Sequence, residues 1–433
     1  MTATTPEPVH EHSWRPAILG VIAMALASFG GMAAVTALGI QVFKVEKREF
    51  HLGLLGLAEF LPSVAFVLIT GVVADRFDRR RVVAVFYSFE ILVFLGLAVF
   101  VRDRPTSVMP FFVFAALYGT TRSFGAPAMR ALIPAAAPPG QLARVVATLS
   151  LAWQGSAIIG PVVGALANRA SRSLPYEIAA VCFTGSVVLV SFIPRSIGRA
   201  HLLHPEGTKQ ERPTLTAALD GFRFIRRTPV LLGAISLDLF AVLFGGAVAL
   251  LPAIVEKILK VDDVWVGYLR AAGGAGAAVV TLLLAVRPVR RHVGQVLLVS
   301  VAVFGAATVV LGVTRNVWIA LIAFMVLNAG DSVSVFVRTT LVPLVTPPEQ
   351  RGRVLATENV FIGASNELGA FESGMAAALF GTVAAVVSGG MLTLVVVVFF
   401  ALRFTALRDV DRFEDIETTP ATGATAATTA TPP

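Results

Sequence analysis

Acidic and basic side chains inside long apolar stretches are the residues of this 433-residue chain best suited to chemistry. A charge near the centre of a bilayer costs at least about 2.5–3.5 kcal/mol, so each such residue needs a partner or a function. A carboxylate beside an arginine can act as a proton-operated switch, because protonation removes its attraction for the guanidinium. Permanent structural ion pairing is the alternative interpretation. The residues concerned are Glu59, Glu90, Arg122, Arg130, Asp238, Arg270, Asp331, Arg338, Glu358, Glu367 and Glu372. Of these, Arg130 and Glu358 lie near the ends of their stretches, which indicates gating or snorkelling groups.

The central position of Arg122 in its stretch makes it the strongest candidate. Asp331 and Asp238 lie at similar depth, Asp238 about 13 Å into its helix at a rise of 1.5 Å per residue. We therefore predict that Arg122 pairs with Asp238 or Asp331 and takes part in substrate binding or proton coupling. Glu59 and Glu367 are further candidates for the same role.

No arrangement typical of an enzyme accompanies these charges. The six histidines and the single cysteine, Cys182, show no metal-ligand or nucleophile spacing, and no P-loop for ATP is present. The net charge of +8 would suit a nucleic acid, but the basic residues sit in short loops between apolar stretches, as in membrane proteins. We expect no catalysis, no metal, no cofactor and no nucleic-acid partner.

The composition predicts an all-α membrane protein. The chain is 56% hydrophobic and only 14% charged, against roughly 25% charged residues in soluble proteins. Its apolar residues gather in stretches long enough to cross a bilayer, which takes about 20 residues. We predict twelve transmembrane helices, six before and six after a long polar loop. They lie near 17–43, 52–74, 82–101, 108–133, 142–167, 174–194, 229–255, 264–286, 293–314, 316–345, 352–380 and 383–405.

These stretches divide the chain into five predicted parts. They are a tail over 1–16, a six-helix bundle over 17–194, a linker over 195–228, a second bundle over 229–405 and a low-complexity, disordered tail over 406–433. In the linker, Leu215, Leu219, Phe222 and Ile225 recur at helical spacing. This pattern predicts an amphipathic helix in the headgroup layer or, alternatively, a solvated linker helix. Most of the 35 Lys and Arg lie on the side of the termini, so we expect both termini in the cytoplasm and the protein in the inner (plasma) membrane.

An internal duplication relates the two predicted bundles. At an offset of 209 residues, the segment 132–148 (LIPAAAPPGQLARVVAT) matches 341–357 (LVPLVTPPEQRGRVLAT) at nine of seventeen positions. The shared polar pattern Pro-Pro-x-Gln-x-x-Arg is not expected by chance between two apolar helices. The offset also relates Arg122 to Asp331. An even number of spans separates the copies, which predicts two parallel six-helix repeats.

A basic loop between the second and third stretches carries a family resemblance. It reads Gly71-Val-Val-Ala-Asp75-Arg76-Phe-Asp78-Arg79-Arg80-Arg81. This resembles G-x-x-x-D-R-x-G-R-R, the inner-loop signature of the major facilitator superfamily, with Asp78 in place of the second glycine. The resemblance implies the major facilitator fold and a gating loop formed by Gly71, Asp75, Arg76, Arg79 and Arg80. An Arg-rich membrane anchor is the alternative interpretation.

A second motif lies in the fifth stretch, Ser156-Ala-Ile-Ile-Gly160-Pro161-Val-Val-Gly164-Ala165. It resembles the family's antiporter motif, g-x-x-x-G-P-x-x-G-G, which implies that Gly160, Pro161 and Gly164 belong to an export antiporter. Ordinary packing of small residues between helices is the alternative. Other runs resemble the bacterial multidrug and enterobactin-exporter-like branch, among them Arg122-Ser-Phe-Gly-Ala-Pro127 and Ser365-Asn366-Glu367-Leu-Gly369.

Together the charges and the resemblance indicate a secondary transporter. We predict proton-coupled export of a small amphipathic compound, either a drug or a siderophore, by a monomer that contacts membrane lipids and uses the proton gradient as its energy source. Lipid or lysophospholipid transport and uptake are alternatives within transport. A membrane-embedded enzyme and a non-transporting sensor are alternatives of other classes.

Overall fold

The computed structural model describes residues 13–199 and 215–413, and in these ranges the backbone forms helices and no strand. Long apolar runs fold this way because a helix satisfies its backbone N–H and C=O groups internally, which lipid requires. The first half contains α1 (Arg15–Glu46), α2 (Glu49–Arg76), α3 (Arg79–Phe100), η1 (Val101–Asp103), α4 (Met109–Ala135), α5 (Leu142–Ala170), α6 (Leu174–Ser191) and α7 (Arg195–Gly198). The second half contains α9 (Leu215–Arg227), α10 (Pro229–Phe244), η2 (Gly246–Val248), α11 (Leu251–Ala253), η3 (Ile254–Leu259), α12 (Val264–Val286), α13 (Val293–Val313), α14 (Val317–Val345), α15 (Arg351–Phe380), α16 (Thr382–Arg403) and α17 (Thr405–Arg408).

The membrane-crossing capacity of these helices confirms the predicted fold class. Ten helices in the described ranges are long and apolar enough to cross a membrane. The helices α4 and α15, with 27 and 30 residues, are not among the ten. Both carry charges within apolar sequence, two arginines in α4 and three glutamates in α15. The count of twelve crossings therefore remains a prediction.

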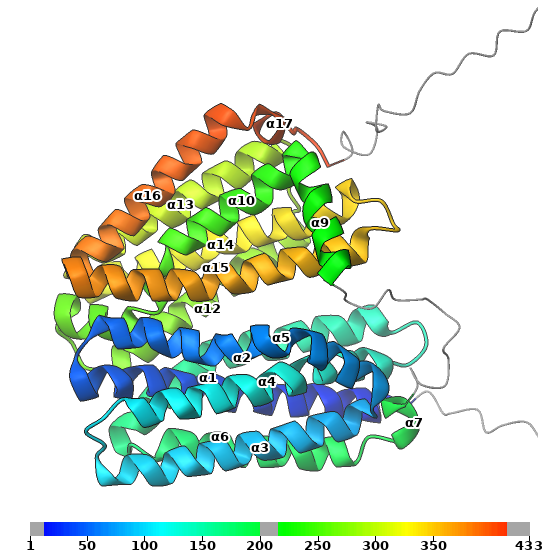
Figure 1. Ribbon diagram of the computed structural model, residues 1–433, viewed down its shortest axis with the longest axis vertical. Helices are drawn as coiled ribbons and strands as arrows, with labels where there is room; N and C mark the ends of the chain where they lie inside the picture. Colours follow the sequence, from blue (N-terminus) through cyan, green and yellow to red (C-terminus); the bar gives the residue numbers. More distant parts are fainter. Residues whose placement is uncertain (1–12, 200–214, 414–433) are drawn as a thin grey trace, which may run out of the picture.

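The helices form two bundles, one from each half of the chain (Figure 1). Aromatic side chains fill much of the first core, where the rings of Tyr87 and Phe183 meet edge to face at 5.1 Å. The second core is mostly aliphatic, with Leu237, Leu297 and Leu341 fully buried. Lipid tails are as apolar as leucine, so van der Waals contact rather than the hydrophobic effect stabilises this packing.

In the described ranges, two helix pairs, α2 with α15 and α5 with α12, make most of the contacts between the bundles. Glycines lie where the backbones come closest. A Cβ atom on Gly53 would lie 3.0 Å from the Cα atom of Phe371, and one on Gly267 would lie 2.6 Å from the carbonyl oxygen of Pro161. Small residues at crossing points are typical of membrane helices, because they let the backbones approach.

The predicted stretch 229–255 does not form one helix. It is broken after Phe244 into α10, η2, α11 and the π-helix η3. Glycines lie at the break, where a Cβ atom on Gly245 would overlap the ring of Phe304 and one on Gly246 would overlap the carbonyl oxygen of Gly369. Irregular backbone at membrane depth is tolerated where it lines a cavity, which these two glycines do.

The linker contributes α9, which packs against the start of α15. Ile225 is buried, and the ring of Phe222 lies 6.1 Å from that of Phe361. Asp220 forms an ion pair of 3.8 Å with Arg353. The rest of the predicted linker (200–214), most of the predicted N-terminal tail (1–12) and most of the C-terminal tail (414–433) lie outside the described residues.

Candidate functional site

A cavity of about 340 Å³ lies between the two bundles, within the size range of small-molecule sites. Its walls are mostly apolar, and its charged side chains are those of Glu59, Arg270, Asp331 and Glu367. The helices α1, α2, α10, α12, α13, α14 and α15 and the broken segment after α10 contribute to it. The lining residues are Val35, Gly39, Leu52, Leu55, Gly56, Glu59, Val242, Gly245, Gly246, Val248, Ala249, Pro252, Arg270, Phe304, Leu327, Asn328, Asp331, Asn366, Glu367 and Ala370.

Arg122 pairs with Glu59, so the prediction that its partner is Asp238 or Asp331 is wrong. One guanidinium nitrogen of Arg122 donates to Glu59 Oε1 at 2.5 Å, and the guanidinium carbon lies 5.8 Å from the Tyr118 ring centroid. The helices α2 and α4 cross closely here, since a Cβ atom on Gly119 would overlap the carbonyl oxygen of Glu59. This crossing brings together two residues that are 63 positions apart.

Glu367, Asp331 and Arg270 enter the cavity from α15, α14 and α12. The carboxylate of Glu367 lies against Gly56, where an added Cβ atom would be 2.9 Å from Glu367 Oε2. The buried Nε atom of Arg270 has no hydrogen-bond partner among the described residues. The cavity thus presents charged groups to whatever enters it.

Asp238 does not line the cavity and belongs to a buried cluster in the second bundle. Arg338 lies 3.0 Å from Asp238 Oδ1 and 3.7 Å from Glu358 Oε1. Ser334 donates a hydrogen bond of 3.3 Å to the same oxygen of Asp238. Glu358 is itself buried, which corrects the expectation that it is a gating or snorkelling group.

The predicted gating loop makes its described contacts within the first bundle. Gly71 and Asp75 belong to α2, but their side-chain surroundings lie outside the described residues, and Arg76 is exposed. Arg79 begins α3, and Arg80 donates to the carbonyl oxygen of Ile193 at 2.5 Å.

Asp78, which stands where the family signature has a glycine, caps α3. Its side chain accepts a hydrogen bond of 3.0 Å from the backbone N–H of Arg80 and pairs with Arg199 at 3.4 Å. Its φ of −57° needs no glycine. The departure from the signature is therefore compatible with the turn.

The antiporter-like motif of α5 forms a tight contact with α1. A Cβ atom on Gly160 would lie 2.8 Å from that of Met32, and one on Gly164 would overlap the backbone of Ala33. On the opposite side, Pro161 meets Gly267 of α12. The small residues of α5 thus pack between α1 of the first bundle and α12 of the second.

Within residues 13–199 and 215–413, four ion pairs between the two bundles lie at the end of the molecule that carries the α1–α2 connection, which we call the α1–α2 end. Lys257 lies 2.5 Å from Glu49, which also accepts a hydrogen bond of 2.7 Å from Thr382. Lys47 lies 2.7 Å from Glu256. The other two pairs are Lys44 with Asp263 and Arg169 with Asp262. The opposite end carries both ends of the described chain together with α7 and α9 (Figure 1).

The chain matches one known protein family over nearly its whole length. A family model described as "Transmembrane secretion effector", of the major facilitator class, matches residues 11–426. The chain belongs to this major facilitator family. It is therefore a multi-pass membrane protein of a transporter family, and the resemblance seen in its motifs is confirmed.

Individual relatives of this transporter-family chain are distant. It is 24% identical over 397 residues to the enterobactin exporter EntS of Shigella boydii, a match covering 89% of this chain and 92% of that protein. It is also 24% identical over 348 residues to YfiS, an uncharacterised MFS-type transporter of Bacillus subtilis, covering 76% and 79%.

Solved structures of similar fold are also transporters. A crystal structure of the nucleoside transporter NupG matches with a TM-score of 0.69 and 12% identity, covering 90% of this chain and 99% of that one. An inward-facing bacterial homologue of the lysosomal transporter Spinster matches with a TM-score of 0.62 and 14% identity, covering 96% and 100%. At such identities these matches establish the fold alone.

Arg270 and Arg338 are not among the site residues predicted from the sequence. Both are charges within apolar stretches, but the position of a residue along its stretch does not show which face of the helix meets the cavity. A cavity-facing position depends on the rotation of α12 and α14 against other helices. Only the assembled bundle supplies that information.

Proposed function

We propose that this chain is a proton-coupled exporter of small amphipathic compounds that works by alternating access. The observation that carries the proposal is the cavity between the bundles, where Glu59, the partner of Arg122, stands among mostly apolar walls. An inner-membrane location with both termini in the cytoplasm completes the proposal. The active unit is the monomer, with membrane lipids around it and the proton gradient as its energy source.

Coupling in this proposal depends on Glu59. A proton on Glu59 removes its charge and releases Arg122, because the attraction between them is electrostatic. The freed guanidinium then interacts with the compound or with Glu367 across the cavity. Loss of the proton restores the pair and lets the compound leave. The direct contact of 2.5 Å between Glu59 and Arg122 supports this role.

The character of the cavity supports an amphipathic compound. Apolar walls with a few charged groups bind a compound through its hydrophobic body and orient it through one or two polar contacts. Arg270 and Glu367 are the groups proposed to make those contacts. The name of the relative EntS makes enterobactin the first compound to test.

Alternating access in this proposal uses the α1–α2 end as one gate. Its four ion pairs hold the bundles together while the opposite end admits the compound. Opening requires these pairs to separate, and the cost is moderate because most of their side chains are partly exposed.

Everted membrane vesicles test the function directly. Vesicles containing the wild-type chain or the Glu59→Gln variant are energised with lactate, and uptake of enterobactin and of a panel of fluorescent amphipathic dyes is followed. We expect wild-type uptake that collapses when a protonophore dissipates the gradient. We expect Glu59→Gln to lose at least about tenfold of that gradient-driven uptake, since it carries no titratable group.

The control is Glu177→Gln, which changes a carboxylate that pairs with Arg102 away from the cavity. It should transport like the wild type. Gradient-driven transport that survives in Glu59→Gln would refute the coupling role. Movement of lysophospholipid with no response to any soluble compound would replace export of amphipathic compounds by lipid transport.

A further inference from the structure

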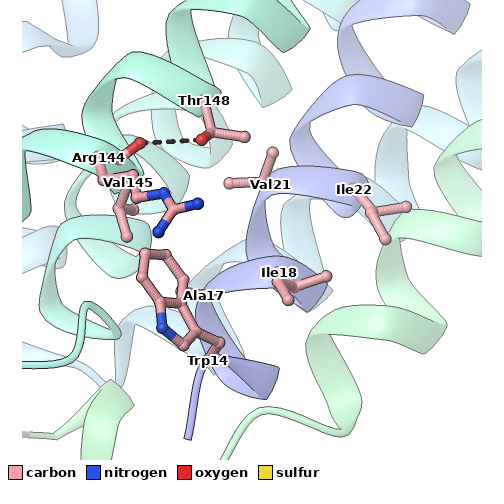
Figure 2. A pocket seen from close by; sticks show the side chains of 8 residues that line it. All are labelled: Trp14, Ala17, Ile18, Val21, Ile22, Arg144, Val145 and Thr148. Atoms are coloured by element: carbon pink, nitrogen blue, oxygen red, sulfur yellow. Dashed lines mark hydrogen bonds between the residues drawn. The ribbon is translucent and has the colours of Figure 1, made fainter. Parts of the chain in front are cut away.

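A groove at the start of α1 is separate from the central cavity, and the two share no lining residue. We call it the Trp14–Arg144 groove. Its volume is about 450 Å³. Figure 2 shows the Arg144 guanidinium above the Trp14 ring, with Ile18, Val21 and Ile22 to the other side. The full lining is Trp14, Ala17, Ile18, Val21, Ile22, Arg144, Val145 and Thr148.

The groove combines one cation with an apolar wall. The Arg144 guanidinium carbon lies 5.3 Å from the Trp14 ring centroid, which is within cation–π range. None of the lining residues is acidic, and the described part of the chain gives Arg144 no carboxylate partner. Ile18 and Ile22 are about half exposed along the wall. A ligand that matches this surface has one anionic group and an apolar body.

The internal duplication shows what kind of group contacts the counterpart of Arg144 in the second half. Arg144 corresponds to Arg353, and in each copy a threonine four residues later donates a 2.9 Å hydrogen bond to the arginine carbonyl oxygen. In the second half, Asp220 of α9 pairs with Arg353 at 3.8 Å, and Gly221 of α9 packs against the same turn. An acidic, amphipathic element therefore covers the repeat arginine there. The described residues supply no such element for Arg144.

We propose that the Trp14–Arg144 groove binds an anionic phospholipid, with its phosphate on Arg144 and an acyl chain along Ile18, Val21 and Ile22. A lipid fits better than the transported compound because the groove is separate from the cavity. Tryptophan at a helix end is typical of the headgroup level, and basic pockets between helices on the cytoplasmic side suit anionic headgroups. The lipid takes the place in the first half that α9 takes in the second.

Quenching of Trp14 fluorescence tests this site. The other tryptophans, Trp153, Trp265 and Trp318, are changed to Phe, and the purified protein in detergent is titrated with dibrominated phosphatidylglycerol or dibrominated phosphatidylcholine. We expect half-maximal quenching at about fivefold lower concentration of the phosphatidylglycerol than of the phosphatidylcholine. This is the preference for an anionic lipid that one arginine near the headgroup provides.

Variants of the repeat arginines separate the groove from general lipid contact. Arg144→Gln should remove the preference for phosphatidylglycerol, and Arg144→Lys should keep most of it. The matched control Arg353→Gln should leave it unchanged, because Asp220 already holds that arginine. Since Arg144 is exposed, a normal size-exclusion profile is expected for its variants.

Other occupants give different results. Equal quenching by both lipids, or a preference that persists in Arg144→Gln, would overturn the proposal. Deletion of residues 2–11 should change little; a large gain in quenching by both lipids would assign the groove to the N-terminal tail instead. Displacement of the brominated lipid by enterobactin would assign it to the transported compound. Because the readout is binding, these outcomes are independent of transport.

Discussion

In the first bundle Glu59, which pairs with Arg122, lines the central cavity, whereas in the second bundle Arg338 lies buried between Asp238 and Glu358. The Arg122 side chain is 55% exposed and that of Glu59 19%, against 3% for Arg338 and 6% for Asp238. A compound or a proton in the cavity can reach Glu59, whereas Arg338 and Asp238 do not line the cavity. This difference fits the coupling role proposed for Glu59 and Arg122, and it indicates a structural role for Arg338, Asp238 and Glu358.

The duplication sharpens this contrast, because the charges are not shared between the copies. Arg122 corresponds to Asp331, and Arg338 corresponds to the apolar Met129. By contrast, Gly160 corresponds to Gly369, and both lie at helix crossings. The two halves thus keep the same packing contacts and carry different intramembrane chemistry. A cavity with two unlike sides can bind and orient an asymmetric compound.

The largest expected effect is that of Arg338→Gln. Removing this cation leaves two buried carboxylates without a partner, which costs about 3–5 kcal/mol. We expect the variant to lose its monodisperse size-exclusion peak or to melt far below the wild type. Neutralising its partners as well, with Asp238→Asn and Glu358→Gln, should restore much of the folded protein because the cluster acts as a unit. A stable Arg338→Gln protein would contradict the structural role of the cluster formed by Arg338, Asp238 and Glu358.

The next largest effect is expected at Gly160 and Gly369, the corresponding glycines at helix crossings in the two halves. Gly160→Leu and Gly369→Leu should both destabilise the protein by about 1–3 kcal/mol or more, because each side chain would enter a backbone contact, with α1 or α10 respectively. Gly155→Leu is the matched control, since nothing lies within 4 Å of its added Cβ atom. Thermal melting in detergent measures the three variants. If Gly160→Leu melts and transports like Gly155→Leu, α5 does not need its small residues for close packing.

Much of this organisation could be predicted from the sequence, and the failures have a common cause. Apolar periodicity and the family motifs identify the helices, and the predicted stretch 142–167 became α5 (Leu142–Ala170). The break after Phe244 was missed because hydropathy is equally high on both sides of Gly245. The partner of Arg122 was missed because pairing depends on how α2 and α4 cross, and no local pattern encodes that crossing.

Substitutions of Glu59 and Arg122 should change stability less than Arg338→Gln does, but should strongly reduce transport. Arg122→Ala and Glu59→Gln should each melt within a few degrees of the wild type, because Glu59 lines the cavity and the Arg122 side chain is about half exposed. Each should reduce gradient-driven transport at least about tenfold. Combining them should cost little more than either alone if they act as one unit. Fully additive losses in vesicle transport would show that the two residues work separately.

The smallest effects are expected at the α1–α2 end, and they differ between two neighbouring ion pairs. Glu49 is nearly buried and binds both Lys257 and Thr382, so Glu49→Gln leaves Lys257 without its anion. Lys47 is largely exposed, and its hydrogen bond with Glu256 raises the pKa of its amine. The pKa of the Lys47 amine therefore lies above its ordinary value of 10.5, and the amine stays charged at every pH below that value. The Lys47–Glu256 pair should accordingly be lost only when the pH rises above 10.5.

Cysteine labelling from the α1–α2 side measures how often that end opens. The reporter is Leu55→Cys, which lies in the cavity, in a Cys182→Ser background that removes the only native thiol. Glu49→Gln should raise the rate of labelling by an impermeant maleimide about tenfold, since the Glu49 carboxylate is shielded from solvent and binds two partners. Lys47→Gln should raise it only a few-fold, because exposed pairs contribute little. Equal rates in the two variants would mean that burial does not set the strength of this gate. A rate unchanged from wild type in Glu49→Gln would remove these ion pairs from the gate altogether.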